Sequence, residues 1–152
     1  MTTAKGSVDV KTYVTAAYNQ WTQFEDFPKF MDGVEEVTQV GDRHLHWRVK
    51  IAGVEREFDA TITEQVPDTR IAWKADGETK HAGVVDFHKL DMETTRVDLQ
   101  LDMEPEGLVE TVGEKLGVVE RRVKKDLERF KELVESQPHP TGAWRGEVPR
   151  EG

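Results

Sequence analysis

The sequence contains no cysteine, which excludes a disulfide framework, a thiol nucleophile and a thiolate metal site. Long apolar runs are also missing, and no segment approaches the ~20 residues needed to span a bilayer. The first residues, Met1 to Gly6, lack the apolar core of a secretory signal. Together these absences favour a cytoplasmic location.

Basic residues are outnumbered: 21 Lys and Arg stand against 30 Asp and Glu, which gives a net charge of −9. Binding of nucleic acid depends on a basic surface, so nucleic acid is an unfavourable partner. The same acidic balance weakens attraction to anionic lipid, so we expect no stable membrane association. None of the five histidines has a metal-binding spacing such as HExxH, and we expect no metal or other cofactor.

What the chain does have is one long amphipathic helix in its last quarter. From Leu108 to Val134, apolar residues recur mostly every three or four positions, while Glu, Lys and Arg fill the opposite face. This apolar stripe must lie against another apolar surface, and the preceding residues are the only candidate. We therefore predict that the helix packs on a sheet.

Before this helix, apolar and polar residues alternate in short runs that end at turn residues, which is the pattern of half-buried strands. Strands are predicted at residues 7–11, 34–40, 45–51, 54–63, 71–75, 83–90 and 97–103. Two short helices are predicted after the first strand, one over 16–24 with Thr15 as its N-cap and one near Pro28. Short turns between strands imply antiparallel pairing, an α+β fold and one domain over 1–136, followed by a polar tail over 137–152.

Six stretches of the chain carry a family pattern: AYNQWT at 17–22, FEDFPKFM at 24–31, VERE at 54–57, ITEQVP at 62–67, GVVDF at 83–87 and TGAWRGE at 141–147. They resemble the polyketide cyclase/dehydrase group of the START-like (SRPBCC) superfamily, including its coenzyme-Q-binding-like domains. The resemblance implies the helix-grip fold, in which a curved antiparallel sheet of six to seven strands wraps around a long C-terminal helix and two short helices close one end. It implies no particular reaction, because the superfamily includes lipid carriers, quinone-binding proteins and aromatic-polyketide cyclases.

The alternation places a largely apolar set of side chains on the sheet face that looks toward the helix. The predicted ligand-binding residues are Trp47, Val49, Arg56, Phe58, Ala60, Ile62, Trp73, Val85, Phe87, Leu99, Leu101, Met103, Leu116 and Gly117. Small-molecule pockets have this character, although the same residues could pack directly on the helix as an ordinary core. With the resemblance, the pattern favours a cavity that binds a small hydrophobic molecule, such as a lipid, a quinone or a polycyclic aromatic compound, in a monomer or weak homodimer.

Arg56 and two helix glycines leave alternatives open. Alternation places Arg56 on the same side as Phe58, where it would anchor a ligand carboxylate or carbonyl or pair with an internal acid. If the strand begins later, Arg56 instead lies at its exposed end, and this is the interpretation we favour. Gly113 and Gly117 border the apolar stripe, where they would either leave room at a pocket entrance or let the helix approach its neighbour closely.

Catalysis remains an alternative function without assigned catalytic residues. The sequence has no Ser-His-Asp order, glycine-rich phosphate loop or inward pair of carboxylates. His44 and His46 are expected on the solvent side of their strand, and His81 follows a turn. A polyketide cyclase or dehydratase could use the same cavity to fold a flexible substrate, assisted by Arg56 or Tyr18. Tyr18 is more simply interpreted as a core residue.

Overall fold

The structure is a computed structural model, and it describes residues 2–31, 33–51, 54–77, 81–103, 112–137, 140, 142–143 and 145–146. At residues 2, 51, 54, 103 and 112–119 only the backbone is described. Strands and helices follow in the order β1 (Thr2–Val10), α1 (Val14–Trp21), the 3₁₀ helix η1 (Phe24–Lys29), β2 (Val34–Gln39), β3 (His44–Ile51), β4 (Val54–Val66), β5 (Arg70–Ala75), β6 (His81–Asp91), β7 (Thr94–Met103) and α2 (Val112–Ser136).

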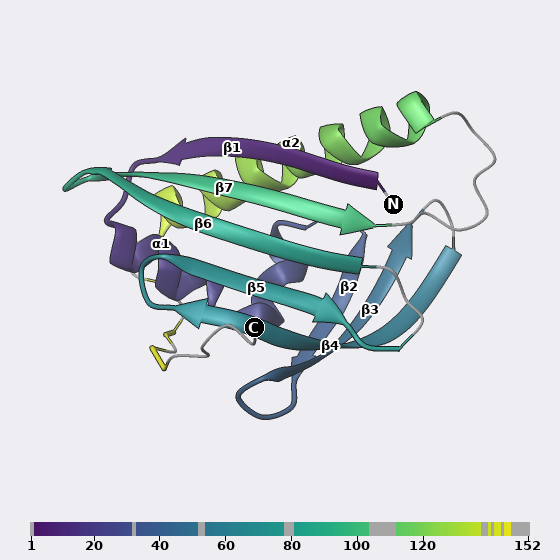
Figure 1. Cartoon of the computed structure of the whole chain (residues 1–152). Helices are drawn as coiled ribbons and strands as arrows, with labels where there is room; N and C mark the ends of the chain where they lie inside the picture. Colours follow the sequence, from purple (N-terminus) through teal and green to yellow (C-terminus); the bar gives the residue numbers. More distant parts are fainter. Residues whose placement is uncertain are drawn as a thin grey trace.

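The seven strands form one antiparallel sheet in the order β1-β7-β6-β5-β4-β3-β2. Figure 1 shows that the strand direction turns strongly between β5 and β2, and that α2 runs along β1 at the other edge. Register shifts at Val34/Glu36, Ile62/Glu64 and Lys89/Asp91 contribute to this curvature, because a bulge bends its strand and increases the local twist. The predicted helix-grip arrangement of sheet and C-terminal helix is therefore confirmed.

Two predicted boundaries are wrong for a physical reason. β1 begins at Thr2 rather than at residue 7, because it pairs with β7 along its whole length, which a weak alternation in the sequence did not reveal. α1 begins at Val14, and its N-cap is Tyr13 in an extended conformation rather than Thr15. Thr15 lies inside the helix, where its hydroxyl donates a hydrogen bond to Asp68 at 3.2 Å.

Aromatic side chains fill the space between the sheet and α2 at the end of the sheet that carries α1. Trp21 is completely buried at the centre of this cluster. Its ring lies 4.9 Å from the ring of Phe130 on α2, 5.4 Å from that of Phe30 and 6.3 Å from that of Phe87 on β6. Tyr18 is also completely buried and meets Phe87 edge-on at 5.5 Å, so it is a core residue as expected.

Part of the segment after α2 is docked on α1. Arg145 donates a hydrogen bond to the side-chain oxygen of Asn19 at 2.7 Å and pairs with Asp68 at 2.9 Å. Its guanidinium also lies 5.5 Å from the centre of the Tyr18 ring, a cation–π distance. This contact joins α1 to the turn between β4 and β5. Among the residues described, no helix has the combination of length and apolarity needed to cross a membrane.

α2 approaches the sheet closely at Gly6 on β1. A Cβ atom at this position would lie 2.8 Å from Cγ1 of Val123 and 3.2 Å from Cδ1 of Leu127. Both of these helix residues are buried, so the missing side chain lets their methyl groups reach the backbone of β1. Gly6 therefore sets the distance between the helix and the edge of the sheet.

Replacing this glycine tests the close approach. Gly6→Val should lower the free energy of unfolding by about 1–3 kcal/mol, because the added methyl groups overpack the contact with α2. Lys5→Val introduces the same valine at the neighbouring exposed position of β1. This variant should change the free energy of unfolding by no more than about 0.5 kcal/mol. Urea denaturation measures both values, and equal losses would contradict the role assigned to Gly6.

Candidate functional site

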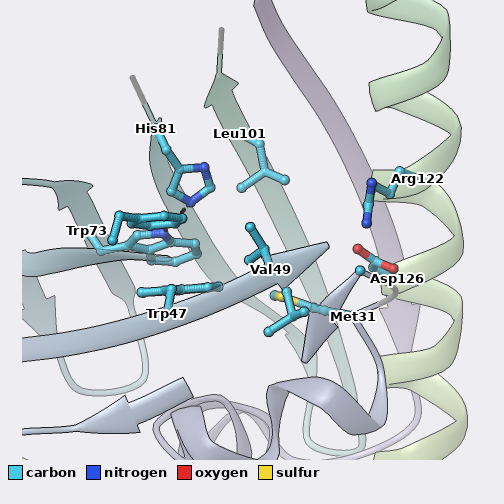
Figure 2. A pocket seen from close by; sticks show the side chains of 11 residues that line it. Met31, Trp47, Val49, Trp73, His81, Leu101, Arg122 and Asp126 are labelled. Carbon is cyan, nitrogen blue, oxygen red and sulfur yellow. Dashed lines mark hydrogen bonds between the residues drawn. The ribbon is translucent and has the colours of Figure 1, made fainter. Parts of the chain in front are cut away.

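A pocket lies between the inner face of the sheet and α2, at the end where β6 begins and β7 finishes. Its lining residues are Met31, Gly33, Val34, Trp47, Val49, Phe58, Trp73, His81, Leu101, Arg122 and Asp126. Figure 2 shows the aromatic residues of the sheet on one side and the two charged residues of α2 on the other. The cavity volume is about 60 Å³. That is room for about two water molecules at about 30 Å³ each, well below the roughly 300–1,000 Å³ of typical ligand pockets.

Apart from Arg56, the structure divides the predicted ligand-binding residues into three groups. Those that line this pocket are Trp47, Val49, Phe58, Trp73 and Leu101. Those that are buried in the core outside its lining are Ala60, Ile62, Val85, Phe87 and Leu99. For Met103, Leu116 and Gly117, and likewise for Gly113, only the backbone is described, so their surroundings lie outside the described part of the structure. The division follows from packing, because aromatic rings from α1, η1 and α2 fill the other end of the inner face.

Arg56 lies inside β4 rather than before it. The strand begins at Val54, and Arg56 pairs with Val49 on β3, so the favoured interpretation of a later strand start is wrong. Ladder pairing with the whole of β3 extends β4 to this point. The Arg56 side chain is half-buried and is not part of the pocket lining.

An aromatic wall forms one side of the pocket. The rings of Trp47 and Phe58 are cross-strand partners and stack at 5.9 Å with an interplanar angle of 10°. Trp73 continues the stack at 6.1 Å from Trp47 and 23°. Trp73 in turn covers its own cross-strand partner Gly83, where a Cβ atom would lie 2.3 Å from the indole. The glycine therefore allows the indole to lie flat on the sheet.

His81 is the polar member of this wall. Its ring lies 5.3 Å from that of Phe58 and 5.7 Å from that of Trp47, and its Nε2 accepts a hydrogen bond from Nε1 of Trp73 at 3.2 Å. Desolvation lowers the pKa of His81 to about 4, although the charge of Asp102 opposes the shift. The imidazole is therefore neutral at pH 7. Sequence reasoning placed His81 after a turn and outside the next strand, because regular alternation begins only at Gly83. The structure makes His81 the first residue of β6.

The opposite wall carries two charged residues of α2, Arg122 and Asp126. Sequence reasoning placed the arginines of this helix on the face away from the sheet and did not single out Asp126. Arg122 and Asp126 are one turn apart, and Asp126 is only 4% exposed. Asp126 also lies 3.9 Å from the guanidinium of Arg129. A sequence signal existed, because Asp126 is three residues after Val123 and four before Phe130, both of which are buried. The described residues contain no cluster of three or more His, Cys, Asp and Glu suited to a metal ion.

Gly33 brings the Arg122 side chain to the corner between η1 and β2. The backbone of Gly33 has φ +85°, and a Cβ atom there would lie 1.6 Å from Nη2 of Arg122 and 3.0 Å from the carbonyl oxygen of Lys50. The guanidinium thus occupies the space that a side chain would need. Arg122 and Gly33 together close the pocket at this corner.

Gly33 can be tested against a matched glycine. Gly41 has nearly the same backbone, φ +88°, but open space around a Cβ atom. Gly33→Ala and Gly41→Ala should both lose about 1–2 kcal/mol for the left-handed conformation. Gly33→Ala should lose about 1 kcal/mol more, because Arg122 must move. Denaturant titration of both variants measures the difference. Equal losses of unfolding free energy would contradict the close contact between the Arg122 guanidinium and the backbone of Gly33.

The pKa of His81 predicts how stability depends on pH. Between about 6.5 and about 4, the unfolded chain binds the proton and the folded protein does not, so the free energy of unfolding decreases as the pH falls through this range. His81→Leu removes that contribution. The stability of the wild type minus that of the variant should therefore decrease between pH 7 and about pH 4.5. Denaturation curves at several pH values measure it, and a constant difference would contradict a neutral His81.

Comparisons with known proteins agree with this architecture. Residues 12–132 match the family described as polyketide cyclase/dehydrase and lipid transport. The chain is 52% identical over 149 residues to an uncharacterized 17.2 kDa protein of Streptomyces lincolnensis, covering 97% of this chain and 99% of the relative. A START superfamily protein of Mycobacterium smegmatis has the same fold, with a TM-score of 0.71 at 16% identity over 88% of this chain and 97% of that structure.

The Zhui aromatase/cyclase of Streptomyces sp. R1128 also shares the fold, with a TM-score of 0.71 at 16% identity over 93% of this chain and 98% of that structure. At such identities the structures demonstrate the fold alone, whereas the family match spans most of the chain. The curved sheet, the gripping helix and the sequence match lead to one conclusion: the chain belongs to the polyketide cyclase/dehydrase and lipid transport family and has the START-like helix-grip fold.

Proposed function

We propose that this protein binds a small hydrophobic molecule in the pocket between the aromatic wall and α2. The observation that carries the proposal is the composition of the lining: aromatic and aliphatic side chains surround a few polar groups, as in most small-molecule sites. Burial of apolar ligand surface would supply the binding free energy at about 25 cal/mol per Å². Membership in a family of lipid transport and cyclase proteins supports the same function.

The pocket must widen to accept a lipid, a quinone or a polycyclic aromatic molecule, because about 60 Å³ is too small for any of them. Two of its side chains are suited to this movement. Met31 is unbranched and can adopt several shapes, and Arg122 reaches the pocket on a long flexible stem. The work of moving them reduces the apparent affinity, since only the open fraction of the protein binds.

Catalysis of a cyclisation or dehydration is a second candidate function, favoured by the presence of His81 and Asp126 in one pocket. An imidazole and a carboxylate are the usual groups for general acid–base chemistry. The same residues also serve in simple binding, where they orient a ligand. Turnover of a polyketide-like chain that is lost in His81→Leu with binding retained would support the enzyme.

Filling the pocket tests the binding function. Native mass spectrometry of wild-type protein with a fatty acid, a short-chain ubiquinone or anthraquinone should show a one-to-one complex with at least one of them. Leu101→Trp places an indole in the pocket and should abolish the complex, whereas Leu90→Trp, at a position of β6 that is 46% exposed, should retain it. Val34→Phe is a milder filling variant at the half-buried edge of the pocket.

Two outcomes of this mass-spectrometry experiment would contradict the proposed binding function. Absence of a complex with every compound would count against the proposal. An unchanged complex in both filling variants, with circular dichroism showing that they are folded, would place the ligand elsewhere.

A further inference from the structure

The hydrogen bond between Trp73 and His81 determines which ring nitrogen of the histidine carries the proton. An indole N–H can only donate, so Nε2 of His81 must be the acceptor in their 3.2 Å contact. A neutral imidazole has one protonated and one unprotonated nitrogen. The proton of neutral His81 is therefore on Nδ1. Trp73 turns the histidine into a hydrogen-bond donor of fixed direction.

The Nδ1–H group lies on the edge of the ring that faces away from Trp73. Figure 2 shows one edge of the His81 ring against Trp73 and the Nδ1 edge turned toward the side of the pocket where Leu101 and Arg122 lie. Among the residues that the structure describes, none accepts a hydrogen bond from Nδ1. A donor in mostly apolar surroundings is stabilised by an acceptor, and water or a ligand oxygen can provide one.

We propose that His81 Nδ1–H donates a hydrogen bond to a neutral acceptor oxygen of the pocket ligand, of the carbonyl class, and that Trp73 is the positioning residue that holds this donor in place. The inference rests on the proposed binding function and identifies the polar group of the pocket that selects the ligand. The stacked rings of Trp47, Phe58 and Trp73 would hold the apolar part of such a ligand beside the donor.

A charged ligand fits the pocket less well. The opposite wall presents Arg122 and Asp126 one turn apart on α2. An anion attracted to the guanidinium of Arg122 would be repelled by the carboxylate of Asp126, and a cation attracted to the carboxylate would be repelled by the guanidinium. Asp102, whose charge acts on His81, is the neighbour of Leu101 on β7 and accepts a hydrogen bond from Thr3 at 2.6 Å. A neutral oxygen avoids these opposed charges.

The tautomer can be measured without any ligand. Heteronuclear NMR of the ring nitrogens at pH 7 should show His81 protonated on Nδ1 and unprotonated on Nε2. Trp73→Phe keeps an aromatic ring but removes the indole donor, so the variant should show a mixture of both tautomers or the Nε2–H form. A predominantly Nε2–H ring in the wild type would overturn the inference, whatever the pocket binds.

Binding is tested with four compounds that share one ring system: indane, indanone, aminoindane and indane carboxylate. Ligand-observed NMR with the full chain should rank indanone first, about three- to tenfold tighter than indane, which is the worth of one net hydrogen bond. In His81→Leu the two neutral compounds should bind equally, because the donor is gone. Trp73→Phe should reduce the preference for indanone while indane still binds.

Each other result has a distinct meaning. His81→Gln retains an N–H donor and should restore part of the preference for indanone, which a purely structural role for His81 would not do. Equal binding of indane and indanone by the wild type overturns this inference but leaves the binding function intact. Tightest binding of aminoindane or of the carboxylate overturns it in favour of Asp126 or Arg122. If the wild type binds none of the four compounds, the result counts against the proposed function itself. The same holds if Leu101→Trp binds them as tightly as the wild type does.

Discussion

The packing of Trp21 against Phe130 is the contact on which the rest of the interior depends. It joins α1 to α2 at a ring distance of 4.9 Å, and Phe27 and Phe87 extend it to η1 and to the sheet. Because these rings fill one end of the space between sheet and helix, the open volume is confined to the other end. The pocket is thus the part of the interior that the aromatic cluster does not reach.

Three glycines determine how side chains pack around the remaining open volume. Gly83 lets the indole of Trp73 lie flat on β6, and this indole directs His81. Gly33 leaves space for the guanidinium of Arg122 at the opposite corner. Gly6 brings α2 close to β1. In each case a missing Cβ allows a functional or structural side chain to approach the backbone, so the position of the polar groups depends on residues that carry no chemistry themselves.

The sequence was most informative where a regular pattern coincided with a pairing partner. Alternation identified β3 and the inward direction of Trp47 and Val49, and three- and four-residue spacing identified α2, whose described bounds begin at Val112. Family resemblance supplied the curvature and the gripping helix, which periodicity alone does not determine.

Other features depend on contacts between distant segments. The sequence did not reveal that β1 starts at Thr2, because that length follows from pairing with β7. It also did not reveal the tautomer of His81, which depends on a residue eight positions earlier. The small volume of the pocket follows from how rings of α1, η1, α2 and the sheet interlock, and no local pattern records such packing.

The placement of the tryptophans has a spectroscopic consequence. Of the three tryptophans that the structure describes, Trp47 and Trp73 lie in the pocket wall, whereas Trp21 is buried in the aromatic cluster. A molecule that enters the pocket contacts the first two and not the third, so it should quench or shift the emission of Trp47 and Trp73 only among these three. The fold thus contains its own optical reporter of occupancy, without a label or a change of sequence.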